Sequence, residues 1–83
     1  MRYFFHTEDG QAFPDDEGIE LPSLAAAKQA ALKFLGEIIR DVDDFWDSGL
    51  YKVIVKNDRG VTLFTLDLTG TVMARPRLVA PRP

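Results

Sequence analysis

Apolar residues in the first part of the chain are spaced as in two short strands. Residues 2–7 include three consecutive aromatic side chains, which suit a pleated and packed surface. The dipeptide at 9–10, Asp-Gly, is typical of a two-residue hairpin turn, so residues 11–13 are expected to return as a second strand. Pro14 cannot donate a backbone hydrogen bond, so the second strand is expected to be short or to lie at an edge of the sheet.

After an acidic turn and a brief extended piece, the middle of the chain has the spacing of an amphipathic helix. Ser23 is a good N-cap residue and precedes a run of alanines. The next apolar residues recur every three or four positions, as on one buried helix face: Leu24, Ala27, Ala31, Leu35, Ile38, Val42 and Phe45. The pattern predicts a helix that continues to about Asp47, although several aspartates near that end conflict with the helix dipole.

Residues 50–56 and 61–68 alternate apolar and polar side chains, which predicts a second hairpin. A four-residue loop at 57–60, with Lys56 opposite Val61, gathers apolar side chains on one face and gives Gly60 a left-handed conformation. That face would carry Tyr51, Val53, Val55, Thr62, Phe64, Leu66 and Leu68.

The expected fold is α+β, with one long helix packed on one face of a four-stranded, mainly antiparallel sheet in ββαββ order. A single domain would span residues 1–69, and residues 70–83 would form a flexible, basic, proline-rich tail. The first strand is aromatic on both sides and is therefore expected to be central. Whether the helix covers its Tyr3/Phe5 side or its Phe4/His6 side stays open.

One helix covers only one face of such a sheet, whereas the strands carry apolar side chains on both. We therefore expect a second copy, or a partner protein, to cover the other face or an edge strand. The candidate interface residues are Phe4, Trp46, Ile54, Leu63, Leu78 and Val79. Trp46 is expected to close the core, and would become an anchor for a partner only if exposed. The last two residues of the set would dock as a short edge strand on this or another chain.

Composition narrows the classes of function. The chain has 83 residues, no cysteine and a formal net charge of −3. These values argue against a disulfide framework, a cysteine-based zinc site and a general nucleic-acid binder. No apolar run approaches the roughly 20 residues that a membrane helix needs, so we expect a cytoplasmic protein with no membrane association.

Side chains that could carry chemistry are few. His6 is the only histidine, and near Glu8, Asp15 and Asp16 it could join a metal site or serve as a general base. A lone histidine without cysteine is a poor ligand set, however, and a hydrogen bond to a neighbour explains it better. The acidic turn lacks the spacing of a calcium-binding loop, and the two serines fit helix ends better than they fit nucleophiles. We therefore predict no enzyme, no catalytic residue, no cofactor and no metal site.

The sequence RYFFH at 2–6, followed by DG at 9–10 and DDEGIELP at 15–22 before an alanine-rich helix, resembles a family of short bacterial proteins. The family is known as domain of unknown function number 6894, and the resemblance spans roughly residues 2–68. It implies no activity. The layout is more loosely similar to HicB-like antitoxin domains, which would imply a regulatory protein that binds a basic partner and possibly DNA. Our first hypothesis is a non-enzymatic interaction module that forms a homodimer, and the antitoxin-like regulator is the alternative.

Overall fold

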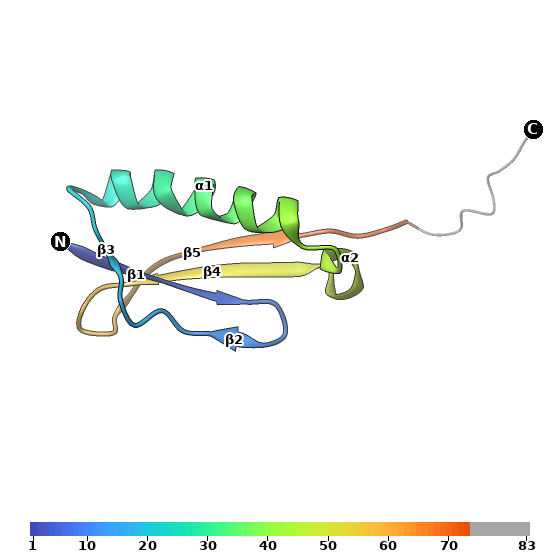
Figure 1. Cartoon of the computed structure of the whole chain (residues 1–83), viewed down its shortest axis with the longest axis horizontal. Helices are drawn as coiled ribbons and strands as arrows, with labels where there is room; N and C mark the ends of the chain where they lie inside the picture. The colour runs from blue at the N-terminus through green and yellow to red at the C-terminus, as the bar shows by residue number, and fades with distance from the viewer. Residues whose placement is uncertain (74–83) are drawn as a thin grey trace, which may run out of the picture.

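The computed structural model describes residues 1–73 as a five-stranded sheet with one long helix across one face (Figure 1). The elements in chain order are β1 (Arg2–Glu8), β2 (Ala12–Phe13), β3 (Ile19–Glu20), α1 (Leu24–Asp41), α2 (Phe45–Ser48), β4 (Leu50–Lys56) and β5 (Thr62–Thr69). The strand order is β2-β1-β4-β5, β3 also pairs with β1, and all pairs are antiparallel. The α+β class and the central position of the first strand are confirmed. The prediction of four strands was wrong, because the brief extended piece at Ile19–Glu20 pairs with Arg2 and Tyr3.

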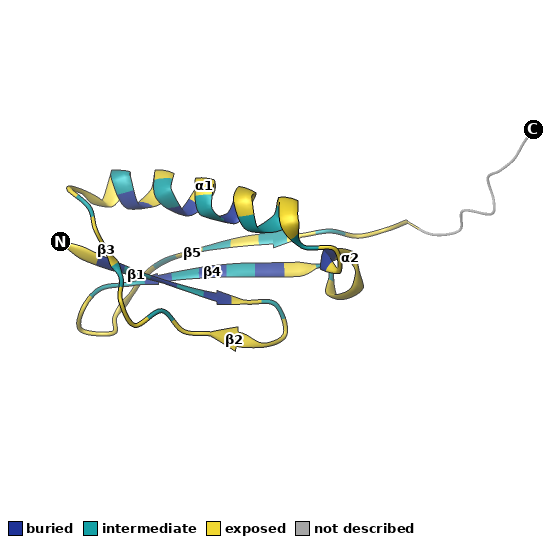
Figure 2. Ribbon diagram, in the orientation of Figure 1, coloured by how far each residue is buried: buried dark blue, intermediate teal, exposed yellow. Residues whose placement is uncertain are grey.

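The core lies between α1 and the Tyr3/Phe5 side of β1, which answers the question that the sequence left open. Its buried residues are Tyr3, Phe5, Ala27, Ala31, Leu35, Phe45, Tyr51, Val53 and Val55. Val53 and Val55 of the inner strand β4 are fully buried. By contrast, β5 contains no buried residue, although Phe64, Leu66 and Leu68 pack against the core (Figure 2). The helix therefore covers β1 and β4 well and β5 only in part.

The second hairpin keeps the predicted faces but not the predicted pairing. Val55 lies opposite Phe64, two residues further along than predicted, and an irregularity in register separates Val55 from Lys56. The larger loop is held by Asn57, whose side-chain oxygen accepts hydrogen bonds from two backbone N–H groups of the loop. Gly60 has a φ of 77°, so its left-handed conformation is confirmed.

The first hairpin also has a longer loop than predicted. Glu8 pairs with Ala12, which leaves three residues between the strands rather than two. Gly10 takes a positive φ of 104°, a conformation that glycine adopts without strain.

The long helix ends earlier than its apolar spacing predicts. It stops at Asp41, because Val42 is extended with φ −98° and ψ 119°. Aspartate is a weak helix former and is unfavourable at the negative end of the helix dipole, which explains why the acidic stretch that follows leaves the helix. Residues 45–48 form the separate short helix α2 instead, with Phe45 buried. Trp46 is 61% exposed, so the expectation that it closes the core was wrong.

Candidate functional site

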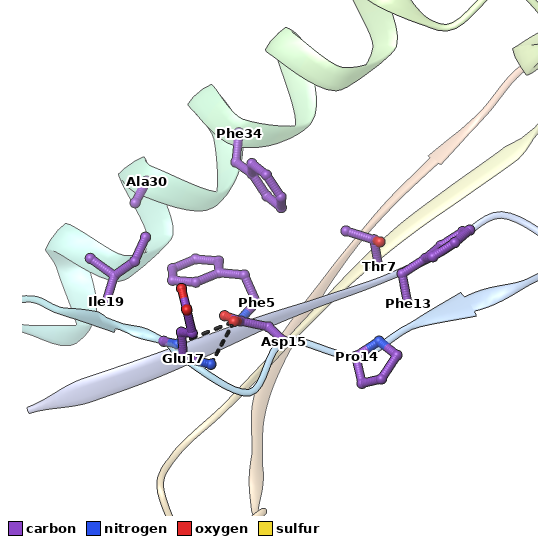
Figure 3. A pocket seen from close by; sticks show the side chains of 10 residues that line it. Phe5, Thr7, Phe13, Pro14, Asp15, Glu17, Ile19, Ala30 and Phe34 are labelled. Carbon is purple, nitrogen blue, oxygen red and sulfur yellow. Dashed lines mark hydrogen bonds between the residues drawn. The ribbon is translucent and has the colours of Figure 1, made fainter.

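A cavity of about 420 Å³ lies between α1, β1 and the segment that joins β2 to β3 (Figure 3). Its walls are largely apolar, and Phe5 meets Phe34 edge to face with ring centroids 6.2 Å apart. The lining residues are Phe5, Thr7, Phe13, Pro14, Asp15, Glu17, Gly18, Ile19, Ala30 and Phe34. Only Asp15 and Glu17 bring charge to it, so any chemistry in this cavity depends on these two carboxylates.

The Asp15 carboxylate accepts hydrogen bonds from three backbone N–H groups of the same chain. One oxygen accepts the N–H of Phe5 at 3.0 Å, and the other accepts the N–H groups of Glu17 and Gly18 at 3.0 and 3.1 Å. The Phe5 N–H points away from β4, at the gap that β2 and β3 leave along the outer edge of β1. Asp15 therefore supplies the acceptor that a neighbouring strand would otherwise supply.

Two acidic groups have altered pKa values. Partial burial of Asp15 acts to raise its pKa, but the hydrogen bonds from Phe5, Gly18 and Glu17 outweigh this and hold the pKa below its ordinary value. The N-terminal ammonium donates a hydrogen bond to Glu20 and lowers the pKa of that carboxyl group as well. Both shifts stabilise the charged form, which is the behaviour of structural anchors rather than of proton donors.

His6 lies next to Asp15 and bonds to its backbone. Its Nδ1 accepts the backbone N–H of Asp15 at 3.1 Å, which confirms the interpretation as a histidine bonded to a neighbour. Asp16 is exposed and makes no such contact. Within residues 1–73 the structure brings no three histidine or acidic side chains together as a metal ion would require.

The predicted interface residues do not form one patch. Phe4, Ile54 and Leu63 share the sheet face that is turned away from α1. Phe4 is partly covered by the acidic turn, since a Cβ atom on Gly18 would lie 2.9 Å from its ring. Trp46 lies elsewhere, at the end of the sheet, with its ring against Phe45. Leu78 and Val79 lie outside the described residues.

The open sheet face is mixed rather than apolar. Ile54 is half-buried and Leu63 is 36% exposed. Polar and charged side chains stand between them on the same face: His6, Lys52, Lys56, Thr65 and Asp67. The face thus offers small apolar areas set among polar and charged groups of both signs.

A second apolar surface, which the sequence analysis missed, lies beside β5. A shallow groove of about 250 Å³ runs between α1 and this strand and is lined by Lys28, Leu32, Phe64, Thr65 and Leu66. Leu32 is 53% exposed although it belongs to the long helix. Leu32 directly follows the buried Ala31 and therefore lies beside the buried face of the helix. An apolar residue at this position, next to the buried face, was the signal available in the sequence.

No helix within residues 1–73 has both the length and the apolar character needed to cross a bilayer. Comparison with family models matches residues 2–69 to a domain of unknown function, DUF6894. Neither the curated proteins nor the solved structures contain a match to this chain. The likeness to HicB-like antitoxins stays a prediction. Because the matched region covers most of the chain, the protein belongs to the DUF6894 family.

Proposed function

We propose that this protein is a non-enzymatic protein-interaction module that self-associates. The observation that supports the proposal is the uncovered apolar surface of β4 and β5. Phe64, Leu66 and Leu68 face the helix yet are only half-buried, and Leu63 is exposed on the other side. Exposed apolar surface of this kind commonly marks an interaction site.

The side chains suited to catalysis already have structural roles. The Asp15 carboxylate accepts three backbone hydrogen bonds, so most of its roughly four acceptor positions are already used. Ser23 caps α1 by accepting the N–H of Ala26 at 3.1 Å, and the Ser48 hydroxyl contacts backbone groups of its own turn. These contacts support a non-enzymatic role.

The size of the domain supports self-association independently. An 83-residue chain buries only about 60% of its unfolded surface, and this one has no cysteine that could form a disulfide. Oligomerisation is a common way to stabilise such a domain.

Light scattering of the full chain, from micromolar to millimolar concentration, tests the proposal. We expect a dimer whose population rises with concentration. A strict monomer over that whole range would overturn self-association. Ile54→Lys probes the open sheet face, and Gln29→Lys, at an exposed position on α1, is its control for the added charge.

The HicB-like alternative would need a basic partner on the acidic segment at 15–20. Asp15 is already engaged in that segment, and nothing among residues 1–73 favours this role over the first. It stays the second hypothesis.

A further inference from the structure

We propose that β5 pairs antiparallel with β5 of a second copy, with Leu66 opposite Leu66 of that copy, so that two sheets join into one. The inference rests on the self-association proposed above and names the surface that produces it. No strand among the described residues pairs with the outer edge of β5. The following features of this strand make a second copy its best occupant.

The backbone of β5 presents hydrogen-bonding groups outward at alternate residues. The N–H of Gly70 donates to the carbonyl of Gly49 at 2.8 Å, one step beyond the Leu50–Thr69 pair. Bonded and non-bonded pairs alternate along an antiparallel ladder, so Phe64, Leu66 and Leu68 bond to β4. The N–H and C=O groups of Thr65, Asp67 and Thr69 therefore point away from the sheet.

This edge lacks the features that usually prevent strands from pairing. Natural edge strands are blunted by lysine, proline, bulges or short length. β5 has eight residues, no proline and a single charge, Asp67. Its irregularity lies next to the loop, at the level of Val55/Lys56, and leaves the rest of the strand regular.

Chain symmetry and the charge of Asp67 select one register. Outward-pointing residues must face one another, so a two-fold axis near the middle of the strand can pass at Thr65, Leu66 or Asp67. An axis at Asp67 puts two like charges opposite each other, and an axis at Thr65 puts Asp67 opposite Leu63. An axis at Leu66 places Asp67 opposite Thr65 of the second copy, whose hydroxyl can donate to the carboxylate.

The same register also pairs the apolar side chains on the helix side of the sheet. Phe64 then lies opposite Leu68 of the second copy, and Leu66 meets its own equivalent. The groove beside Leu32 borders this edge strand, because Phe64 and Leu66 form part of its lining. A second copy would cover these half-buried side chains, which α1 alone leaves partly in solvent.

Charge argues against the other way of pairing two copies. Stacking two open sheet faces would enclose Lys52 and Lys56 of both copies between the sheets, and taking these charges out of water costs free energy. Edge pairing keeps these lysines apart and leaves both open faces free. The edge is therefore the better self-association surface.

Charge reversal at the paired positions tests the register by light scattering. Thr65→Glu places a carboxylate opposite Asp67 of the second copy at two symmetric sites, and we expect it to weaken the dimer about tenfold or more. Asp67→Lys alone should leave the dimer intact, because lysine then faces threonine. The Thr65→Glu/Asp67→Lys double variant should restore the dimer, since opposite charges then face each other. Circular dichroism of each variant verifies that the sheet still forms.

A cysteine cross-link tests the two-fold axis directly. Leu66 and its equivalent would form a non-bonded pair, in which Cα atoms lie about 4.5 Å apart, within reach of a disulfide. The chain has no cysteine of its own. Leu66→Cys should therefore form a covalent dimer under mild oxidation, whereas Ile54→Cys on the open face should not.

The outcomes separate this inference from the proposed function. A wild-type chain that is monomeric at all concentrations overturns both. A wild-type dimer that resists Thr65→Glu but dissociates on Ile54→Lys overturns edge pairing and leaves self-association standing. Failure of the double variant to restore the dimer, or of Leu66→Cys to cross-link, overturns the register.

Discussion

The two edges of the sheet differ in whether other segments of the described chain pair with them. Along the outer edge of β1, β3 pairs with one end, β2 with the other, and the Asp15 carboxylate occupies the gap between them. Along the outer edge of β5, no described residue pairs at all. The core-facing side chains differ accordingly, since Tyr3 and Phe5 are buried while those of β5 are half-buried. Within residues 1–73, the chain thus closes one edge of the sheet itself and leaves the other edge unpaired.

Closing the β1 edge takes a whole segment of the chain. The segment from Ala12 to Leu21 runs along β1, and it is held at its far end by the Leu21 N–H, which donates to Met1 at 3.0 Å. Ordering each residue of such a segment costs about 1–2 kcal/mol of conformational entropy. Within residues 1–73 no comparable segment lies beside β5, so the outward-pointing hydrogen-bonding groups of this strand have no partner strand there.

The largest expected effect on stability distinguishes the residues of β5 whose backbone N–H bonds to β4 from those whose N–H points away from the sheet. Leu66→Pro removes an N–H that bonds to β4 and leaves its acceptor unpaired, and we expect the largest loss in the free energy of unfolding, at the upper end of about 1–3 kcal/mol or beyond. Thr65→Pro removes an outward-pointing N–H, so it should cost the monomer much less while abolishing the dimer. Urea unfolding followed by circular dichroism measures both. Equal losses for the two prolines would contradict the assigned backbone alternation.

The next largest effect on the free energy of unfolding concerns Asp15 at the outer edge of β1. Asp15→Ala leaves the Phe5 N–H without its acceptor, and we expect a loss of about 1–3 kcal/mol in unfolding free energy. Asp16→Ala is the matched control, because Asp16 is exposed, and it should change the unfolding free energy by no more than about 0.5 kcal/mol. Hydrogen exchange adds a local measurement, in which the Phe5 amide should lose protection in Asp15→Ala alone. Unchanged protection there would show that Asp15 does not cap the edge.

The sequence was sufficient for the elements whose signal is local and periodic. The helix stripe at Ala27, Ala31 and Leu35, and the alternation of β4, were predicted because burial repeats with the period of each element. The roles of Asp15 and Leu32 were not predicted, because each depends on a contact with a distant part of the chain. A carboxylate in an acidic turn looks solvated until the gap in the neighbouring edge is known. Pairing registers were likewise missed, because loop length is set by side-chain bonds such as those of Asn57.

Acid should weaken the closed edge through the same carboxylate. The folded-state pKa of Asp15 lies below its ordinary value of 3.8, so the charged form stabilises the fold above about pH 4. This stabilisation should be lost as the pH falls through the lower folded-state pKa. Unfolding free energies of wild type and Asp15→Asn should therefore converge in acid. A difference that stays constant across this range would rule out the carboxylate charge as the cause. Glu20 titrates in both proteins, so its effect cancels in the comparison.

The smallest effect on stability belongs to the one charge on the open edge. Asp67 lies opposite Lys52 on the exposed face, so Asp67→Asn should cost about 0.5 kcal/mol or less in unfolding free energy, as Asp58→Asn in the loop should. Its effect on pairing should be larger than its effect on folding. Without the charge, an axis at residue 67 no longer brings two carboxylates together, so several registers become comparable in energy. The Leu66→Cys cross-link should then form less completely in the Asp67→Asn background, although the protein is nearly as stable. An undiminished cross-link would mean that apolar pairing alone selects the register, and that Asp67 does not contribute to the specificity of the β5 edge.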